Sequence, residues 1–148
     1  MEVIIFIGIQ ATGKSTFYLE KFFNTHMRIS MDMLNTRHKE QKFLDSCYSI
    51  QQPFVVDNTN PGKADRYKYI EKAKENKYKV IGYYFQSKLQ DSLKRNTQRQ
   101  GKENIPEIGI KGTFSKLEIP SLDEGFDELY YVEIKNDTFE IKDWKDEI

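Results

Sequence analysis

Apolar runs alternate with amphipathic stretches along this chain, and the alternation predicts its architecture. Residues 3–7 form a continuous run of β-branched and aromatic side chains, which is typical of a strand buried on both faces. Further apolar runs predict strands at residues 26–30, 53–57, 78–85 and 129–134. Helical spacing of apolar residues predicts helices from residue 14, over 39–51, over 61–76, from 87 and over 105–117. This order predicts an α/β fold: a parallel sheet of about five strands, helices on both faces and a C-terminal hairpin.

A glycine-containing segment follows the first strand and opens the first helix. Its sequence, Gly8-Ile9-Gln10-Ala11-Thr12-Gly13-Lys14-Ser15-Thr16, matches the G-x-x-x-x-G-K-S pattern of phosphate-binding loops. Glycine lets such a loop curl so that backbone N–H groups and the helix N-terminus point at phosphate oxygens. We expect Lys14 to reach the β- and γ-phosphates and the Ser15 hydroxyl to bind Mg²⁺. The expected nucleotide-binding residues are Gly8, Gln10, Ala11, Thr12, Gly13, Lys14, Ser15 and Thr16.

Two aspartates follow predicted strands at the edge where open α/β sheets bind their ligands. Asp57 closes the third apolar run, as the Mg²⁺ carboxylate of P-loop proteins does, and we assign it to the metal. Asp32 comes just after the second strand. Its role stays open among a helix cap, a water-mediated Mg²⁺ ligand and the base that accepts the proton of an attacking hydroxyl. Asn60, just before Pro61, also fits a helix cap.

Two arginines lie on the helix that we expect to begin at the capping-box pattern Ser87-Lys88-Leu89-Gln90. Arg95 and Arg99 are four residues apart, so they would share one face of that helix. A pair of this kind suits an anion clamp over phosphates, whereas the commoner explanation is a solvated helix face. The phosphate-binding loop earlier in the chain favours the clamp.

Length and composition predict one domain over residues 1–148, with a lid-like helical region at about 87–118. The single Cys47 excludes an internal disulfide and fits a buried apolar position in a cytoplasmic protein. No apolar run approaches the roughly 20 residues of a membrane span, so we expect no membrane association. The net charge is zero, yet residues 61–80 hold seven basic and three acidic side chains, and residues 118–148 hold three and eleven. The charges cancel over the whole chain, but basic and acidic residues are concentrated in different segments. The zero net charge therefore does not exclude a polyanionic partner.

Several motifs in this order resemble the kinase domain of polynucleotide 5′-hydroxyl kinases of the phage and animal type. They are the phosphate-binding loop, Ser30-Met31-Asp32, Asp57-Asn58-Thr59-Asn60-Pro61, Lys94-Arg95-Asn96 with Arg99, Ile105-Pro106 and Pro120-Ser121-Leu122-Asp123-Glu124-Gly125-Phe126. The resemblance implies that Asp32 is the general base for the 5′-hydroxyl and that Lys14 and Ser15 serve the phosphates and Mg²⁺. It also implies that Arg99 and Arg95 are lid arginines that brace the phosphates of ATP or another NTP.

The chain also departs from that family's pattern, chiefly where the acceptor would bind. Ser30-Met31 stands where the family usually has Asn-Arg, and Gln10-Ala11 stands where its loop often has Pro-Gly. The phage-type arginine three residues after the base is Asn35 here. Arg28 and Arg37 are close enough in sequence to replace it. The candidate substrate-binding residues are Arg28, Arg37, Asn58 and Asn60.

Three functions remain open from the sequence. The first is an ATP- and Mg²⁺-dependent kinase acting on the 5′-hydroxyl of RNA or DNA. The second is a P-loop kinase of a small metabolite or nucleoside. The third is a nucleotide-binding switch or partner protein without transfer activity, and Asp32 argues against it because a switch needs a Gln or Arg directed at water. The acceptor, the preferred NTP, the oligomeric state and any separate phosphatase or ligase stay undetermined.

Overall fold

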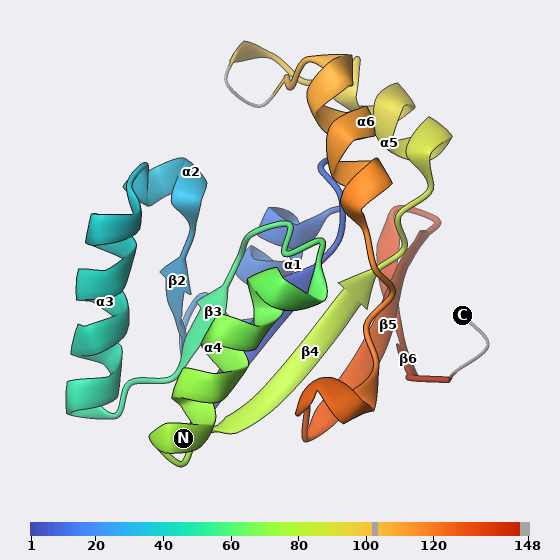
Figure 1. The fold of residues 1–148 in the computed structure, drawn as a ribbon. Helices are drawn as coiled ribbons and strands as arrows, with labels where there is room; N and C mark the ends of the chain where they lie inside the picture. Colours follow the sequence, from blue (N-terminus) through green and yellow to red (C-terminus); the bar gives the residue numbers. More distant parts are fainter. Residues whose placement is uncertain (102–103, 146–148) are drawn as a thin grey trace.

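The computed structural model describes residues 1–101 and 104–145 and contains one six-stranded sheet (Figure 1). The strands lie in the order β2-β3-β1-β4-β5-β6. Their bounds are β1 Glu2–Ile7, β2 Met27–Ile29, β3 Phe54–Val56, β4 Lys79–Phe85, β5 Glu128–Lys135 and β6 Thr138–Asp143. The first five strands pair in parallel, and β6 is an antiparallel edge strand joined to β5 by a hairpin. The α/β fold with a parallel sheet and a C-terminal hairpin is therefore confirmed.

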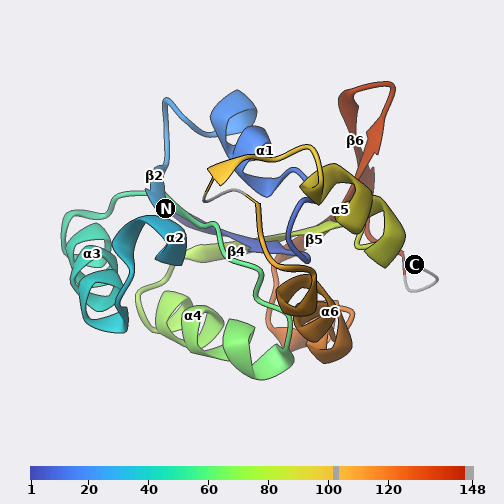
Figure 2. The same ribbon diagram turned by 90° about the horizontal axis from the view of Figure 1, so that it is seen from above.

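Helices cover both faces of the sheet. Their bounds are α1 Lys14–Lys21, α2 Met31–Leu34, α3 Arg37–Ile50, α4 Lys63–Glu75, α5 Leu89–Asn96 and α6 Glu107–Lys116, with a short 3₁₀ helix, η2, at Leu122–Glu124. Seen from above, α1 lies on one face, and α3 and α4 lie on the other (Figure 2). α2, α5 and α6 lie beyond the carboxyl ends of the parallel strands (Figure 1). Among the residues described, no helix is long and apolar enough to cross a membrane.

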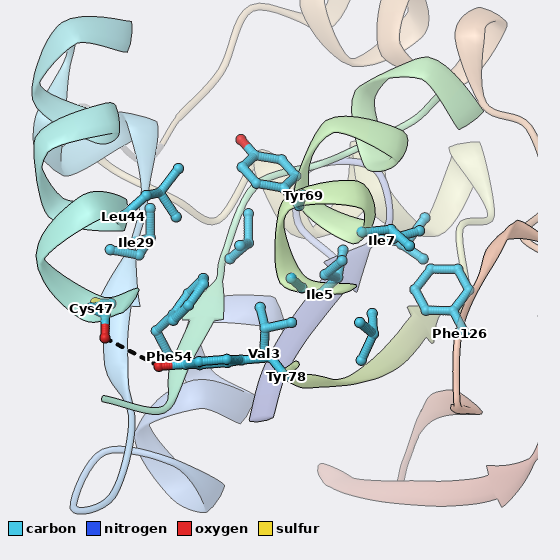
Figure 3. Close-up of a cluster of buried hydrophobic side chains, with 14 of the residues drawn as sticks. Val3, Ile5, Ile7, Ile29, Leu44, Cys47, Phe54, Tyr69, Tyr78 and Phe126 are labelled. Atoms are coloured by element: carbon cyan, nitrogen blue, oxygen red, sulfur yellow. Dashed lines mark hydrogen bonds between the residues drawn. The ribbon is translucent and has the colours of Figure 1, made fainter. Parts of the chain in front are cut away.

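The sheet is buried between two apolar clusters. The first lies under α3 and α4 and includes Val3, Ile5 and Tyr78, whose hydroxyl donates to the Cys47 carbonyl over 3.1 Å (Figure 3). The second lies under α1, where the rings of Phe6 and Phe17 pack edge to face with their centroids 5.8 Å apart. β1 contributes to both clusters, because successive side chains of a strand point to opposite faces. This explains its uninterrupted apolar sequence.

Cys47 lies in the first cluster, as its sequence context predicted. Its side chain is buried on α3, and burial raises the pKa of the thiol to about 11. A thiol with a raised pKa is a poor nucleophile at neutral pH, since the thiolate is the reactive form. Cys47 is therefore a packing residue.

The structure corrects the prediction for the helix that carries the arginines. Ser87 does not cap it: the N-cap of α5 is Lys88, and no side chain accepts a hydrogen bond there. α5 also ends at Asn96, so Arg95 and Arg99 do not share a helix face. The Asn96 amide donates to the Ile105 carbonyl over 2.6 Å and accepts from its N–H over 2.9 Å. This pairing turns the chain back toward α6. Residues 102 and 103, which fall within the predicted lid-like region, lie outside the described residues.

The expected cap at Asn60 is also wrong. α4 begins at Lys63 with Gly62 as its N-cap, so Pro61 is not the first helical residue. The Asn60 side chain is buried and donates to the Phe6 carbonyl over 2.8 Å. Its backbone has φ 44°, in the left-handed region that asparagine tolerates better than most residues. Asn60 therefore joins the chain after β3 to the end of β1.

A buried ion pair joins α4 to η2. The fully buried guanidinium of Arg66 donates to both carboxylate oxygens of Glu124, over 2.8 and 3.1 Å. Its Nη1 donates to the carbonyls of Asn60 and Pro61 over 2.9 and 3.0 Å. Glu124 also accepts from the Ser121 N–H over 2.9 Å, as part of a capping box at residues 121–124. Arg66 therefore connects three segments of the chain through one charge.

We expect Glu124→Gln to lower the free energy of unfolding by ~3–5 kcal/mol. The substitution keeps the side-chain volume and leaves Arg66 as a buried charge without its counter-ion. Urea unfolding followed by circular dichroism would measure the loss. Asp123→Asn, at the exposed neighbouring position of the same turn, is the control and should change stability by no more than ~0.5 kcal/mol. A loss below ~1 kcal/mol for Glu124→Gln would contradict the role given to the ion pair.

Candidate active site

The phosphate-binding loop joins β1 to α1 and has a tightly constrained backbone. Gly13 has φ 92°, and a Cβ added there would lie 2.8 Å from Cε1 of Phe139. Only glycine therefore fits where the β5–β6 hairpin packs on the loop. Ala11 has φ 61° and is buried. An L-residue in this region carries ~1–2 kcal/mol of strain, so the loop adopts at Ala11 a conformation that glycine would take without cost.

Residues from two neighbouring strand ends bind the loop backbone. The Gly8 N–H donates to the Thr59 carbonyl, which follows β3, over 3.0 Å. The Ile9 N–H donates to the Ser87 hydroxyl, which follows β4, over 3.0 Å. Ser87 in turn donates to the Phe85 carbonyl over 2.8 Å. Sequence reasoning missed Ser87 as a site residue, although its place after the strand next to β1 was a usable signal.

Two further contacts tie the loop to α5 and α6. Arg95, on α5, donates from Nη1 to the Ala11 carbonyl over 3.2 Å. Gln10 donates from Nε2 to the Thr113 hydroxyl on α6 over 2.9 Å. Thr113 was not among the predicted residues, since an α6 threonine about a hundred positions from the loop gives no local signal. Thr12 is buried and donates to the Ile9 carbonyl, whereas Thr16 lies exposed on α1.

Lys14, the first residue of α1, has its amine inside the loop. Nζ donates to the Ile9 carbonyl over 2.8 Å, and the side chain is buried. Burial lowers the pKa of Lys14 to about 8, Asp57 opposes that shift, Arg99 adds to it and Asp32 opposes it. The charges of Asp57, Arg99 and Asp32 therefore all act on this one amine. The fold thus places Asp57, Arg99 and Asp32, which lie far apart in the sequence, around Lys14.

Ser15, the second residue of α1, lies within hydrogen-bond distance of Asp57, which follows β3. The Ser15 hydroxyl donates to Asp57 Oδ2 over 3.1 Å. Arg28 donates to the same oxygen from Nε over 2.8 Å and to Ser15 Oγ from Nη2 over 3.1 Å. The Arg28 guanidinium therefore contacts both Ser15 and Asp57, the two residues assigned to Mg²⁺.

A hydroxyl and one carboxylate suit Mg²⁺, which keeps several waters and takes phosphate oxygens as further ligands. In the part of the chain that the structure describes, no cluster of three or more His, Cys, Asp or Glu side chains could hold a metal ion. The donor set therefore fits a Mg²⁺ ion carried on a phosphate and not an all-protein metal site.

Asp32 lies in the first turn of α2, with its side chain exposed at the carboxyl edge of the sheet. The N-cap of α2 is Ser30, so a helix cap is excluded as the reason for Asp32. The Met31 N–H donates to Asn58 Oδ1 over 2.9 Å. Because Asn58 follows β3, this bond fixes the start of α2 relative to the sheet. Asn58 is therefore engaged in positioning the segment that carries Asp32.

A polar cluster supports Asn58 from α3 and α4. The Tyr69 hydroxyl donates to the buried carboxylate of Glu40 over 2.8 Å, and Arg37 Nη1 donates to Glu40 Oε1 over 3.0 Å. Arg37 also donates to the Tyr69 hydroxyl over 3.2 Å. Burial first, and then the hydrogen bond to Glu40, raise the pKa of Tyr69 well above its usual value. Arg37 is thereby anchored next to α2 while most of its side chain stays exposed.

Comparison with known proteins supports a kinase fold. No family model matches the chain. The chain is 26% identical over 149 residues to the bifunctional polynucleotide phosphatase/kinase of Schizosaccharomyces pombe, and the match covers 98% of this chain and 36% of that protein. A putative bifunctional polynucleotide phosphatase/kinase of Acanthamoeba polyphaga mimivirus is 27% identical over 160 residues, with 97% and 36% covered. The chain thus spans 36% of the length of each of these curated relatives.

Solved structures give the same architecture at lower identity. Kti12 of Chaetomium thermophilum, in complex with ADP-AlF₃, aligns with a TM-score of 0.65 at 17% identity and covers 91% of this chain and 90% of that one. A gluconokinase from Sinorhizobium meliloti aligns with a TM-score of 0.62 at 17% identity, with 91% and 83% covered. The chain has the P-loop kinase fold, and its resemblance to polynucleotide kinases is confirmed.

We expect Asn58→Ala to loosen the start of α2. The Met31 N–H loses its acceptor, so its exchange with solvent should become at least ~10-fold faster, which corresponds to the loss of about one hydrogen bond. Hydrogen exchange followed by NMR would measure this. The Asp57 N–H, which donates to the Ile29 carbonyl over 2.8 Å, is the internal control and should keep its rate. Equal acceleration of both amides would indicate general destabilisation and would contradict the positioning role.

Proposed function

We propose that this chain is an ATP- and Mg²⁺-dependent kinase that transfers the γ-phosphate to the 5′-hydroxyl of RNA or DNA. One observation carries the proposal: the buried Lys14 amine lies inside a phosphate-binding loop, next to a Ser15 hydroxyl that donates to Asp57 over 3.1 Å, with Asp32 exposed at the same edge of the sheet. A kinase needs a phosphate cation, a metal carboxylate, a bracing arginine and a base at one place. The polynucleotide acceptor is supported by the names of the curated relatives.

The donor nucleotide would bind on the loop and the N-terminus of α1. Backbone N–H groups of residues 10–16 and the helix dipole favour its phosphates. Lys14 would exchange its bond to the Ile9 carbonyl for phosphate oxygens. Ser15 and Asp57 would hold Mg²⁺, which neutralises charge on the β- and γ-phosphates when it is bound.

The lid would consist of the helical region at about 87–118, apart from residues 102–103, which lie outside the described residues. Among the described residues, hydrogen bonds link it to the loop from Ile9 to Ser87, from Arg95 to Ala11 and from Gln10 to Thr113. Through these links, closure of the lid and ordering of the loop would occur together. Arg95 and Arg99 would then brace the transferring phosphoryl group, as arginines do in other phosphoryl-transfer enzymes.

The acceptor would approach from the side of α2. Asp32 is exposed there and can accept the proton of the attacking hydroxyl. Arg37, anchored by Glu40, is the arginine best placed near α2 to bind an acceptor phosphate. We do not assign Asn60 to substrate binding, because its side chain is buried and donates to the Phe6 carbonyl. Asn58 would contribute indirectly, because its hydrogen bond with the Met31 N–H fixes the start of α2, which carries Asp32.

Asp32→Asn should separate transfer from nucleotide binding. The amide cannot accept the hydroxyl proton, so phosphorylation of a 5′-hydroxyl oligonucleotide should fall by ~10²-fold or more at every Mg²⁺ concentration. Affinity for ADP should stay within ~2-fold. Labelled ATP with a set of RNA and DNA acceptors would measure transfer, and fluorescence anisotropy of labelled ADP would measure binding. Asp45→Asn, on the exposed face of α3, is the matched control.

Two results would count against this assignment. Recovery of Asp32→Asn by high Mg²⁺ would make Asp32 a metal ligand and not a base. Normal transfer by the variant would show that Asp32 is not the base, and the kinase activity itself would stand. If wild type binds ADP and phosphorylates no oligonucleotide, the polynucleotide acceptor is wrong and the donor site stands.

Nucleotide affinity should depend on pH through Lys14. In the protein alone its pKa is about 8, and bound phosphates raise the pKa by favouring the ammonium form. Binding therefore takes up a proton above pH 8. Affinity should be flat below about pH 7 and fall by up to ~10-fold per pH unit above pH 8. Anisotropy of labelled ADP from pH 6.5 to 9.5 would show this, and Lys14→Met should bind weakly without the inflection near pH 8.

A further inference from the structure

The guanidinium of Arg28 lies at the oxygen atoms that we assign to Mg²⁺. It bonds to Asp57 Oδ2 over 2.8 Å and to Ser15 Oγ over 3.1 Å. We propose that Arg28 is a tethered competitor of the metal, which has to withdraw from Ser15 before a divalent cation can bind there. Arg28 thereby sets the cation concentration that the site requires. The inference rests on the proposed function for the assignment of Ser15 and Asp57 to the metal.

The hydroxyl of Ser15 shows why the two cations compete. It has one proton and two lone pairs, and the proton is donated to Asp57 Oδ2. One lone pair accepts from Arg28 Nη2. A cation shared by Ser15 and Asp57 must lie on the side of the hydroxyl that faces Asp57, about 2.1 Å from the oxygen. Arg28 occupies that side, because the same guanidinium contacts both residues.

Burial decides which group moves. The Asp57 side chain is 2% exposed and the Arg28 side chain 28% exposed. Asp57 is thus fixed in the interior, whereas the guanidinium has a path to solvent. A dication and a guanidinium that share the Asp57 carboxylate also repel each other, because both are positively charged. When the metal binds, Arg28 is therefore the group that leaves, and Asp57 stays.

The tether makes the competition effective. The backbone of Arg28 is held in β2, where it pairs with Val55 of β3. The guanidinium can move only within the reach of its side chain, so its local concentration at Asp57 remains high compared with that of a free cation. The pair also protects the buried carboxylate from standing alone, which would be costly. Arg28 thus neutralises Asp57 whenever the metal does not.

Metal binding without nucleotide tests this inference directly. Binding of Mn²⁺ alone, measured by electron paramagnetic resonance, would be compared between wild type and Arg28→Gln. We expect the variant to bind Mn²⁺ at least ~10-fold more tightly, because one charge-assisted hydrogen bond no longer has to be broken. Arg28→Lys keeps a positive charge near Asp57 but lacks the planar guanidinium that also contacts Ser15. Its Mn²⁺ affinity should therefore lie between those of wild type and Arg28→Gln. Lys21→Gln, an exposed lysine in the last turn of α1, is the control for a lost charge and should match wild type.

A second measurement and a double variant complete the test. The Mg²⁺ concentration needed for tight ADP binding should fall ~10-fold in Arg28→Gln, while ADP binding in EDTA stays unchanged. Arg28→Gln combined with Asp57→Asn removes both charges, so it should fold and should lose the gain in Mn²⁺ affinity. Equal Mn²⁺ affinity in wild type and Arg28→Gln would overturn the inference and make the pair purely structural. Absence of ADP binding in wild type would instead contradict the proposed function, and the Mn²⁺ comparison would still decide the role of Arg28.

Discussion

The buried guanidinium of Arg66 fixes the site more than any single residue within it. A charge with no access to water has to find acceptors for its N–H groups, and Arg66 finds them in Glu124 and in the carbonyls of Asn60 and Pro61. These acceptors determine the path of the chain after β3. The same segment supplies the Thr59 carbonyl to Gly8 and the Asn60 amide to Phe6. The start of the phosphate-binding loop therefore depends on an ion pair that has no contact with it. The segments at residues 57–61 and 120–126, which carry two motifs of the sequence, both supply acceptors to Arg66: the Asn60 and Pro61 carbonyls from one, and the Glu124 carboxylate from the other.

The sequence predicted the elements whose signal is local. The uninterrupted apolar run of β1 reports burial on two faces, and Asn136-Asp137 turns β5 into β6 with both residues at positive φ. The errors lie where a distant partner decided the conformation. α5 ends at Asn96 because its amide pairs with Ile105, and Asn60 faces Phe6 instead of capping a helix. Ser87 has the pattern of a cap, and its hydroxyl bonds to the loop instead. A side chain with two possible partners cannot be assigned from spacing alone.

The candidate site divides in the same way. Lys14 and Ser15 could be identified because a loop between strand and helix places them by local geometry, and Asp32 and Asp57 because parallel strands end at one edge. The pairing of Arg28 with Asp57 could not be identified from the sequence. Nothing in their separation along the chain indicates that β2 and β3 bring these two side chains together. Ala11 is a further case. Its left-handed backbone is held by contacts on both sides of the loop, and the strain at that position is balanced by packing that the sequence does not display.

Under the proposed function, the site exchanges bonds within the protein for bonds to phosphate and metal. Lys14 already donates to a loop carbonyl, Arg95 to another, and Arg28 to a hydroxyl and a carboxylate. Each cation is therefore held near its working position by oxygen atoms of the protein itself, which resemble the ligand oxygens that would replace them. A site built this way needs little reorganisation when a ligand arrives, which is the condition under which charges stabilise a transition state most effectively. It also carries a cost, because every protein oxygen that holds a cation competes with the ligand for it. The affinity of this site is therefore the difference between two similar sets of bonds. Arg28 differs from the other two cations because it competes with the metal and not with the nucleotide, so it affects nucleotide affinity only when a metal is present.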